Sequence, residues 1–403
     1  MKNLLLPTLL ISIFQLSACS SSSDDEEEVL VDAYLQFYNG AANSAATLMA
    51  EVDGNTLGIA TYGDASSLIT LENGEVELEF YRIDAEAQQV TLEEVTVDLS
   101  DGEKDLMILS GDYENPSFAE HRYERENLEG HFRLFATSVI SGSGTYDLYM
   151  SKAGEPFSAA NLLGTINYEQ FDELTYWDPD TDSDDFDEGE YTLYLTEPGT
   201  NEPLFETATI SFAFDTEYVL VLRTTSGAIQ GNVVVDIIIN SSAVANYADE
   251  DATARYRVHN SLDDSESVSL TLGGNEGTSD DMTLGANTLS DFSEVEFGDY
   301  RLTAVIGDEG FNNRLITLNQ GESKAFILYR DEEDKVNSIS FEESNLPQVF
   351  DHQIQIVNLT PDFFDIDFYF VRQDETIESL SIKYQAWTMK KAEVLLCRVT
   401  FMS

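Results

Sequence analysis

Hydrophobic and polar residues alternate along most of this chain beyond residue 30. The clearest stretch, residues 189–195, is a glycine followed by a strand-like run, and similar stretches lie at residues 74–80 and 298–304. Alternation with a period of two is typical of a β-strand with one buried face. The three copies are about 110 residues apart, which is the size of one small domain. The pattern therefore predicts an array of similar β modules.

An opening strand and a late apolar strand recur with a similar spacing. The opening strands are predicted at residues 33–39, 131–135, 254–260 and 352–358. Asn39, Asn260 and Asn358 end three of them, and an asparagine there favours a turn in which the side chain bonds its own backbone and positive φ is tolerated. The late strands, at residues 105–109, 218–222 and 325–329, are almost wholly apolar. We expect each late strand to be central in its sheet, with both faces covered.

Short strands, regular turns and few helical periods predict an all-β protein made of tandem antiparallel immunoglobulin-like β-sandwich modules. The order of opening strand, second strand, glycine-led strand and late apolar strand resembles the repeated β-sandwich modules of unknown function in secreted bacterial proteins and lipoproteins. The resemblance covers most of residues 30–383. The second module departs from it, because no asparagine follows Phe135. The resemblance implies a fold and a compartment, and it assigns no catalytic residues.

Composition limits the possible partners. The chain carries 76 acidic and 20 basic residues, a formal charge of −56, and 42% of its residues are hydrophobic. Such a chain has enough apolar surface for packed cores, so the charge indicates a solvated shell on folded modules. A basic patch for nucleic acid or for an anionic membrane surface is not expected. The two cysteines, Cys19 and Cys397, cannot cross-link several modules.

The first residues have the pattern of an exported lipoprotein. Residues 1–18 contain a positive start, an apolar run and small residues, which predicts a signal peptide. Residues 16–19 resemble the lipobox of bacterial lipoproteins, in which Cys19 is lipidated and becomes the first residue. By the sorting rule of those proteins, Ser20 implies an outer-membrane location, on either the periplasmic or the outer side. Residues 19–29 then form an acidic tether, and the lipid on Cys19 joins the protein to the membrane.

We expect β-sandwich modules over residues 30–126, 127–245 and 250–345, followed by an incomplete fourth module over 350–403. No glycine-led strand follows the fourth opening strand, and the composition changes at Lys383. The last 21 residues carry four bases and one acid, whereas the rest of the chain carries 16 bases and 75 acids. One hypothesis is that residues 387–403 are the product of a frameshift or a broken gene, which leaves open strand edges. The alternative is a genuine basic tail.

An acidic stretch is the strongest candidate for a metal site. Asp178, Asp180, Asp182 and Asp184 provide oxygen ligands at alternate positions, as in calcium-binding loops. The pattern is incomplete, because Ser183 stands where an EF-hand-type loop needs glycine and Gly189 stands where it needs glutamate. A Ca²⁺ site and a solvated acidic insertion are the two alternatives.

Signals for catalysis are weak. Histidines 121, 131, 259 and 352 are scattered, and 76 acidic residues provide carboxylate pairs at every spacing. The first hypothesis is a non-catalytic, lipid-anchored binding or structural protein of the cell envelope, adhesive through exposed loops, with an envelope protein or a polysaccharide as partner. The second is a polysaccharide-binding accessory protein of an envelope enzyme system. The third is an enzyme whose pocket the sequence does not display.

Overall fold

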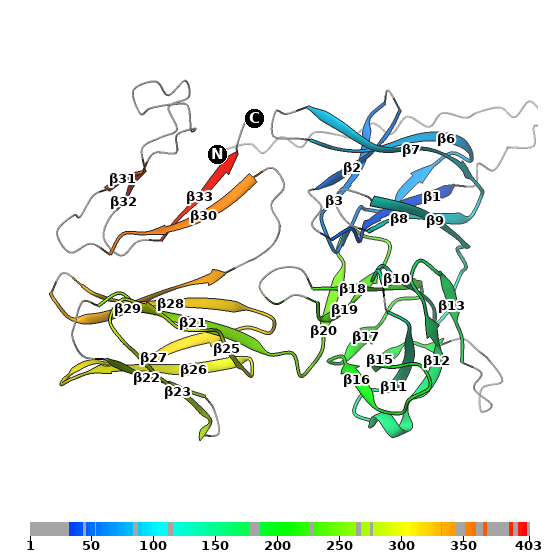
Figure 1. Ribbon diagram of the computed structural model, residues 1–403. Helices are drawn as coiled ribbons and strands as arrows, with labels where there is room; N and C mark the ends of the chain where they lie inside the picture. The colour runs from blue at the N-terminus through cyan, green and yellow to red at the C-terminus, as the bar shows by residue number, and fades with distance from the viewer. Residues whose placement is uncertain are drawn as a thin grey trace, which may run out of the picture.

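The computed structural model describes residues 32–42, 46–52, 54–83, 88–111, 116–142, 144–176, 186–225, 229, 231–262, 267–274, 277–331, 333–343, 351–359, 366–368, 387–389 and 394–400. Over these residues the protein is almost entirely β, and its sheets pack as sandwiches, as the sequence predicts (Figure 1). Each sandwich has an opening sheet, which holds the module's first strand, and a glycine-led sheet, which holds the strand that begins at the recurrent glycine.

Module 1 contains β1 (Ala33–Asn39), β2 (Thr47–Glu51), β3 (Thr56–Ala60), β4 (Asp64–Ala65), β5 (Ile69–Leu71), β6 (Gly74–Ile83), β7 (Gln89–Leu99), β8 (Glu103–Gly111) and β9 (Pro116–Glu124). Its opening sheet has the order β4-β1-β8-β9, with β5 also paired to β1. Its glycine-led sheet has the order β3-β2-β6-β7. The chain enters the module at β1 and leaves it by β9, so entry and exit flank β8.

Module 2 contains β10 (His131–Ser138), β11 (Tyr146–Lys152), the short 3₁₀ helix η1 (Phe157–Ala159), β12 (Asn161–Ile166), β13 (Asp172–Leu174), β14 (Phe186–Asp187), β15 (Gly189–Thr196), β16 (Pro203–Glu206), β17 (Ile210–Phe212), β18 (Glu217–Thr224), β19 (Val233–Ile238) and β20 (Ala245–Ala248). Its opening sheet has the order β13-β10-β18-β19-β20, and its glycine-led sheet has the order β12-β11-β15-β16. Strand β20 follows β19 as an extra edge strand, with no counterpart among the described strands of module 1.

Module 3 contains β21 (Ala254–Asn260), β22 (Val268–Gly273), β23 (Ser279–Leu284), β24 (Thr288–Leu289), β25 (Ser293–Val295), β26 (Gly298–Ile306), β27 (Glu309–Leu318), β28 (Ser323–Arg330) and β29 (Val336–Glu343). Its sheets, β24-β21-β28-β29 and β23-β22-β26-β27, repeat the two orders of module 1. Beyond it, β30 (Asp351–Val357) pairs with β33 (Val394–Thr400), and β31 (Ile366–Phe368) pairs with β32 (Trp387–Met389). We call residues 351–403 the fourth unit.

The three glycine-led strands are confirmed, since β6, β15 and β26 begin at Gly74, Gly189 and Gly298. Gly298 has a φ of 147°, a conformation that residues with a Cβ rarely adopt. The glycine at this start is therefore a backbone requirement in module 3.

The opening sheets differ in one respect from the antiparallel prediction. Each contains one parallel pair, β1 with β8, β10 with β18 and β21 with β28. Between the two strands of each pair the chain crosses to the glycine-led sheet and returns, so the late strand enters the opening sheet in the same direction as the first. The pair has six matched residues in every module, and its register is the same each time.

The residues that end the opening strands form the expected local bond. The backbone N–H of Ala41 donates to Asn39 Oδ1 at 3.2 Å, and that of Leu262 donates to Asn260 Oδ1 at 3.1 Å. In module 2, Ser138 takes the same place and its Oγ accepts from the N–H of Ile140. Neither asparagine has positive φ, so the side-chain bond explains their presence. A serine performs this role where the asparagine pattern is broken.

Replacing Asn260 by alanine should lower the free energy of unfolding by about 1–3 kcal/mol, because buried backbone groups would lose their partners. Asn260 is fully buried, and its amide also donates to the carbonyl of Gly285 at 2.9 Å. Urea titration of the purified chain measures the effect. The matched control is Asn312→Ala on β27, where the side chain is exposed. Equal stability of the two variants would contradict this role.

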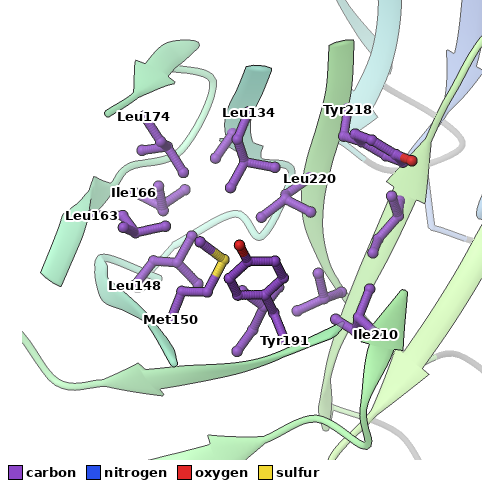
Figure 2. Close-up of a cluster of buried hydrophobic side chains, with 14 of the residues drawn as sticks. Leu134, Leu148, Met150, Leu163, Ile166, Leu174, Tyr191, Ile210, Tyr218 and Leu220 are labelled. Carbon is purple, nitrogen blue, oxygen red and sulfur yellow. The ribbon is translucent and has the colours of Figure 1, made fainter. Parts of the chain in front are cut away.

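The core of module 2 shows how the two sheets of a sandwich contribute (Figure 2). Leu134 and Leu220 come from the opening sheet, and Leu148, Met150 and Tyr191 come from the glycine-led sheet. Every one of them is almost completely buried. Burial on this scale is the main contribution to the stability of the module. The described residues of the module contain no disulfide.

Candidate functional site

The opening sheets of modules 1 and 2 pack face to face and form a core that neither module has alone. We call this the shared core. Leu106 and Ile108 of β8 belong to the same buried cluster as Val219 and Val221 of β18. The remaining buried members are Tyr38, Ala65, Tyr123, Phe135, Val139 and Ile238. Strands β8 and β18 are therefore covered on both faces, as predicted, because the second face of each is covered by the other module.

A buried polar network crosses the shared core at Asp236. The Tyr38 hydroxyl of module 1 donates to Asp236 Oδ2 at 2.7 Å. Within module 2, Arg223 Nε donates to the same oxygen at 2.5 Å and Asn246 Nδ2 donates to Oδ1 at 2.7 Å. Burial raises the pKa of the Asp236 carboxyl, and the Arg223 guanidinium opposes that shift. With three donors, one of them the cation Arg223, the fully buried carboxylate is satisfied only when both modules are in place.

The cation Lys104 lies on the same interface. Its Nζ donates to Asn240 Oδ1 of module 2 at 3.2 Å and lies 5.7 Å from the centre of the Tyr123 ring. Lys104 is fully buried. Burial, helped by the positive charge of Arg125, lowers the pKa of the Lys104 amine to about 7, against the attraction of Glu217. At neutral pH this lysine is therefore close to losing its charge.

Further polar contacts fix the relative orientation of modules 1 and 2. Gln36 Nε2 of β1 donates to the carbonyls of Ile239 and Ser241 at 3.0 and 3.1 Å. In the connection between the modules, the backbone N–H of Glu126 donates to Glu217 Oε1 at 2.9 Å. Directional bonds of this kind allow one arrangement of an apolar interface and disfavour others. The two modules form one body with a defined orientation.

A cavity recurs at equivalent positions in modules 2 and 3. In module 2 it has a volume of about 280 Å³ and lies between the ends of β11, β12, β14 and β15. In module 3 a cavity of about 430 Å³ lies between the corresponding strands β22, β23, β25 and β26. Tyr191 and Tyr300, two residues after the recurrent glycine, line these cavities. Their hydroxyls donate to the carbonyls of Asp187 and Glu296.

The cavities combine aromatic, amide and carboxylate groups. In module 2 the lining includes Tyr176, Asn161, Glu155, Asp187 and the cation Lys152. In module 3 it includes Asp280, Glu294, Glu296 and Ser293. The Tyr256 hydroxyl donates to Asp280 Oδ2 at 2.6 Å and so orients that carboxylate. Such linings can donate and accept hydrogen bonds with a small polar ligand and offer it aromatic surface.

The site residues predicted from the sequence fall elsewhere. Cys19 and Asp178, Asp180, Asp182 and Asp184 lie outside the described residues, so lipidation and the Ca²⁺ site stay predictions. Within the described ranges, no group of three His, Cys, Asp or Glu side chains is arranged to hold a metal ion. No helix among the described residues is both long and apolar enough to span a membrane.

The two histidines of the module 1 and module 2 sheets have ordinary structural surroundings. His121 stacks on Phe171, with the ring centres 4.6 Å apart, and burial lowers its pKa. His131 Nδ1 lies 3.4 Å from Asp187 Oδ1 at a strand end. His121 thus packs against a ring of module 2, and His131 lies beside a carboxylate of its own module.

The polar network at Asp236 was not predicted, although the sequence contains a signal for it. Asp236 interrupts an otherwise apolar run at residues 233–239, and Lys104 directly precedes the apolar strand at 105–109. A charge within a strand that is buried on both faces needs a partner. Which module provides that partner depends on the packing of the sheets, and no local pattern encodes it.

No protein-family model matches the chain, and no curated protein matches it. Among solved structures, it is similar to the Bacillus anthracis TIE protein, with 8% identity, a TM-score of 0.17, and coverage of 74% of this chain and 49% of that one. It is also similar to a "putative cell adhesion protein" from Bacteroides ovatus, with 10% identity, a TM-score of 0.21, and coverage of 54% of this chain and 98% of that one. The chain thus spans about half the length of the first protein. At these TM-scores neither similarity carries an argument about function.

Proposed function

We propose that the protein is a non-catalytic, lipid-anchored binding or structural protein of the cell envelope, with an adhesive role. The observation that carries the proposal is the shared core, which makes modules 1 and 2 a single body of defined orientation. A rigid body presents its loops in a fixed arrangement, which reduces the entropy lost when a partner binds. Sandwich loops are the usual place for recognition residues. The partner in this proposal is a protein or a polysaccharide of the envelope.

The anchor is proposed from residues 16–19, and two cysteines allow a matched test. Cys19→Ser should abolish incorporation of labelled palmitate and release the protein from the membrane fraction, because acyl chains provide the anchor. Cys397→Ser, which alters the other cysteine of the chain, should leave both unchanged. Labelling that persists in Cys19→Ser would contradict the anchor.

The adhesive role requires modules on the cell surface. Protease added to intact cells that express the protein should degrade the modules, while a periplasmic control protein survives. If the modules are degraded only after the outer membrane is opened, they lie in the periplasm, and the adhesive role is wrong. The structural role would then be sought among periplasmic partners.

The recurrent cavities favour a second candidate, a polysaccharide-binding accessory protein. Tyr176 is 37% exposed at the module 2 cavity, and an exposed ring beside carboxylates is suited to a sugar face. If the candidate is right, Tyr176→Ala should weaken binding to envelope polysaccharide about ten-fold or more. Tyr168→Ala is the matched control, because Tyr168 is also 37% exposed and lies outside the cavity. Calorimetry measures both, and equal affinities would remove this candidate.

A further inference from the structure

The opening sheet of module 3 has an outer face, directed away from its own core. Phe326 and Leu328 of β28 lie in the core, so Ala325, Ile327 and Tyr329 between and beside them point outward. On β29, Phe341 pairs with Ala325 and Ile339 pairs with Ile327, which places both on the same outward side. We call these five residues the outer face. Ala325 and Tyr329 are nearly buried and the other three are half-buried, although none of the five belongs to the core of module 3.

The outer face of module 3 corresponds position by position to the face of module 1 that forms the shared core. The registers of β1 with β8 and of β21 with β28 place Ala325 and Ile327 where module 1 has Leu106 and Ile108. The registers of β8 with β9 and of β28 with β29 place Ile339 and Phe341 where module 1 has Ala119 and His121. The face is thus the counterpart of one that is known to hold a second sandwich.

The chain after module 3 also corresponds to the chain after module 1. The connection from Glu124 to His131 and the connection from Glu343 to Asp351 differ in length by a single residue. In the first pair, Phe135 of β10 stacks on Tyr123 of β9, with ring centres 4.5 Å apart. Counted back from Ser138, which ends β10, and from Asn358, which follows the last residue of β30, Gln355 takes the place of Phe135.

The fourth unit has a different contact at this position, a hydrogen bond made by an exposed side chain. Gln355 Nε2 donates to the carbonyl of Glu342 on β29 at 2.8 Å, and Glu342 is next to Glu343, the counterpart of Tyr123. Figure 1 shows β30 beside β29, as β10 lies beside β9. The first strand of the fourth unit therefore contacts module 3 where the first strand of module 2 contacts module 1.

We propose that the repeating unit of the chain is a pair of modules, and that the outer face of module 3 is the docking surface for the fourth unit, residues 351–403. The occupant is this segment because a connection of nearly the same length joins it to module 3 and because Gln355 of its first strand bonds Glu342 on β29. Modules 1 and 3 share the same sheet orders, whereas module 2 has the extra strand β20. A chain that arose by duplication of a two-module pair would show this alternation of sheet orders.

The edge of the docking surface carries its own recognition groups. Arg255 and Arg257 of β21 lie over the Phe292 ring, 4.1 and 4.7 Å from its centre, and Arg257 pairs with Glu343. Phe292 is 41% exposed and nearby Leu289 is 54% exposed. Module 1 has Gln36 at the place of Arg257, and Gln36 bonds module 2 across the interface. The corresponding edge of module 3 thus carries an arginine whose charge is balanced by Glu343.

Hydroxyl-radical footprinting of the full chain tests the docking. Tyr329, Ile339 and Phe341 should oxidise much more slowly than Leu315, which is 56% exposed on β27 of the other sheet. Ile339→Glu should raise the oxidation of Tyr329 and of residues 355–359 about ten-fold, because docking would bury a carboxylate without a partner. Leu315→Glu, with the same change on the opposite face, should alter neither.

Two results would overturn the proposal. If Tyr329 and Phe341 oxidise as fast as Leu315 in the unaltered chain, nothing covers the outer face. If Ile339→Glu exposes module 3 and leaves residues 355–359 unchanged, another occupant covers it. Protection that disappears on dilution, with a matching loss of dimer in light scattering, identifies that occupant as a second copy of the chain.

Discussion

Replacing Arg223 by leucine should lower the free energy of unfolding by about 3–5 kcal/mol, because it leaves a buried carboxylate without its cation. Asp236 is completely buried, and Arg223 Nε lies 2.5 Å from its Oδ2. The carboxylate would keep bonds from Tyr38 and Asn246 alone. Urea unfolding of the purified chain, followed by circular dichroism, measures the loss.

The matched control is Arg301→Leu on β26, an exposed arginine in a strand, for which we expect a change within about 0.5 kcal/mol. Tyr38→Phe removes only the hydroxyl that module 1 contributes and should cost about 1–3 kcal/mol. A loss below about 1 kcal/mol for Arg223→Leu would mean that water or a rearranged side chain reaches Asp236. The network would then not hold the two modules together.

Stability should increase with pH above neutrality because of Lys104. Its pKa is lowered to about 7 by burial in the folded protein, whereas the unfolded chain keeps an ordinary lysine pKa of about 10.4. Between these values the amine is neutral when folded and charged when unfolded, so unfolding must take up a proton. Raising the pH opposes that uptake, and the free energy of unfolding should rise by about 2 kcal/mol from pH 7 to pH 9.

Lys104→Met provides the control, because it keeps a long side chain and removes the titrating amine. The unfolding free energy of this variant should be nearly constant over the same pH range, so the difference from the parent chain isolates Lys104. Below pH 7 the charged amine is present in both states of the parent chain, and the two proteins should then show the same slope. A parent chain whose stability stays flat or falls from pH 7 to pH 9 would contradict the lowered pKa.

Local patterns predicted the elements of the fold well. The glycine-led strands begin at Gly74, Gly189 and Gly298, because the glycine and the alternation that follows are both local properties. The burial of both faces of β8 was also predictable, because a strand of almost wholly apolar residues has no polar face to expose to solvent. The bond from the backbone N–H of Leu262 to Asn260 Oδ1 spans two residues and could be predicted for the same reason.

The remaining features depend on contacts between distant residues. The parallel pairing of β1 with β8 follows from the path of the chain between two sheets, and that path has no local pattern. Tyr38 and Asp236 are 198 residues apart and become partners through the packing of modules. The recurrent cavity depends on the Gly-x-Tyr spacing at Gly189 and Gly298, and the same spacing is also typical of an ordinary alternating strand. Module 1 has Val76 where the other two have tyrosine, and this difference could have identified the tyrosine as special.

The order of the opening sheet has a mechanical consequence. Entry through β1 and exit through β9 lie on either side of β8, two strand spacings or about 10 Å apart. A pulling force applied between the N-terminal end and module 2 would therefore pass across these three strands and leave the glycine-led sheet of module 1 unloaded. Module 1 would add almost nothing to the reach of the chain, and under tension it would lie beside the line of force.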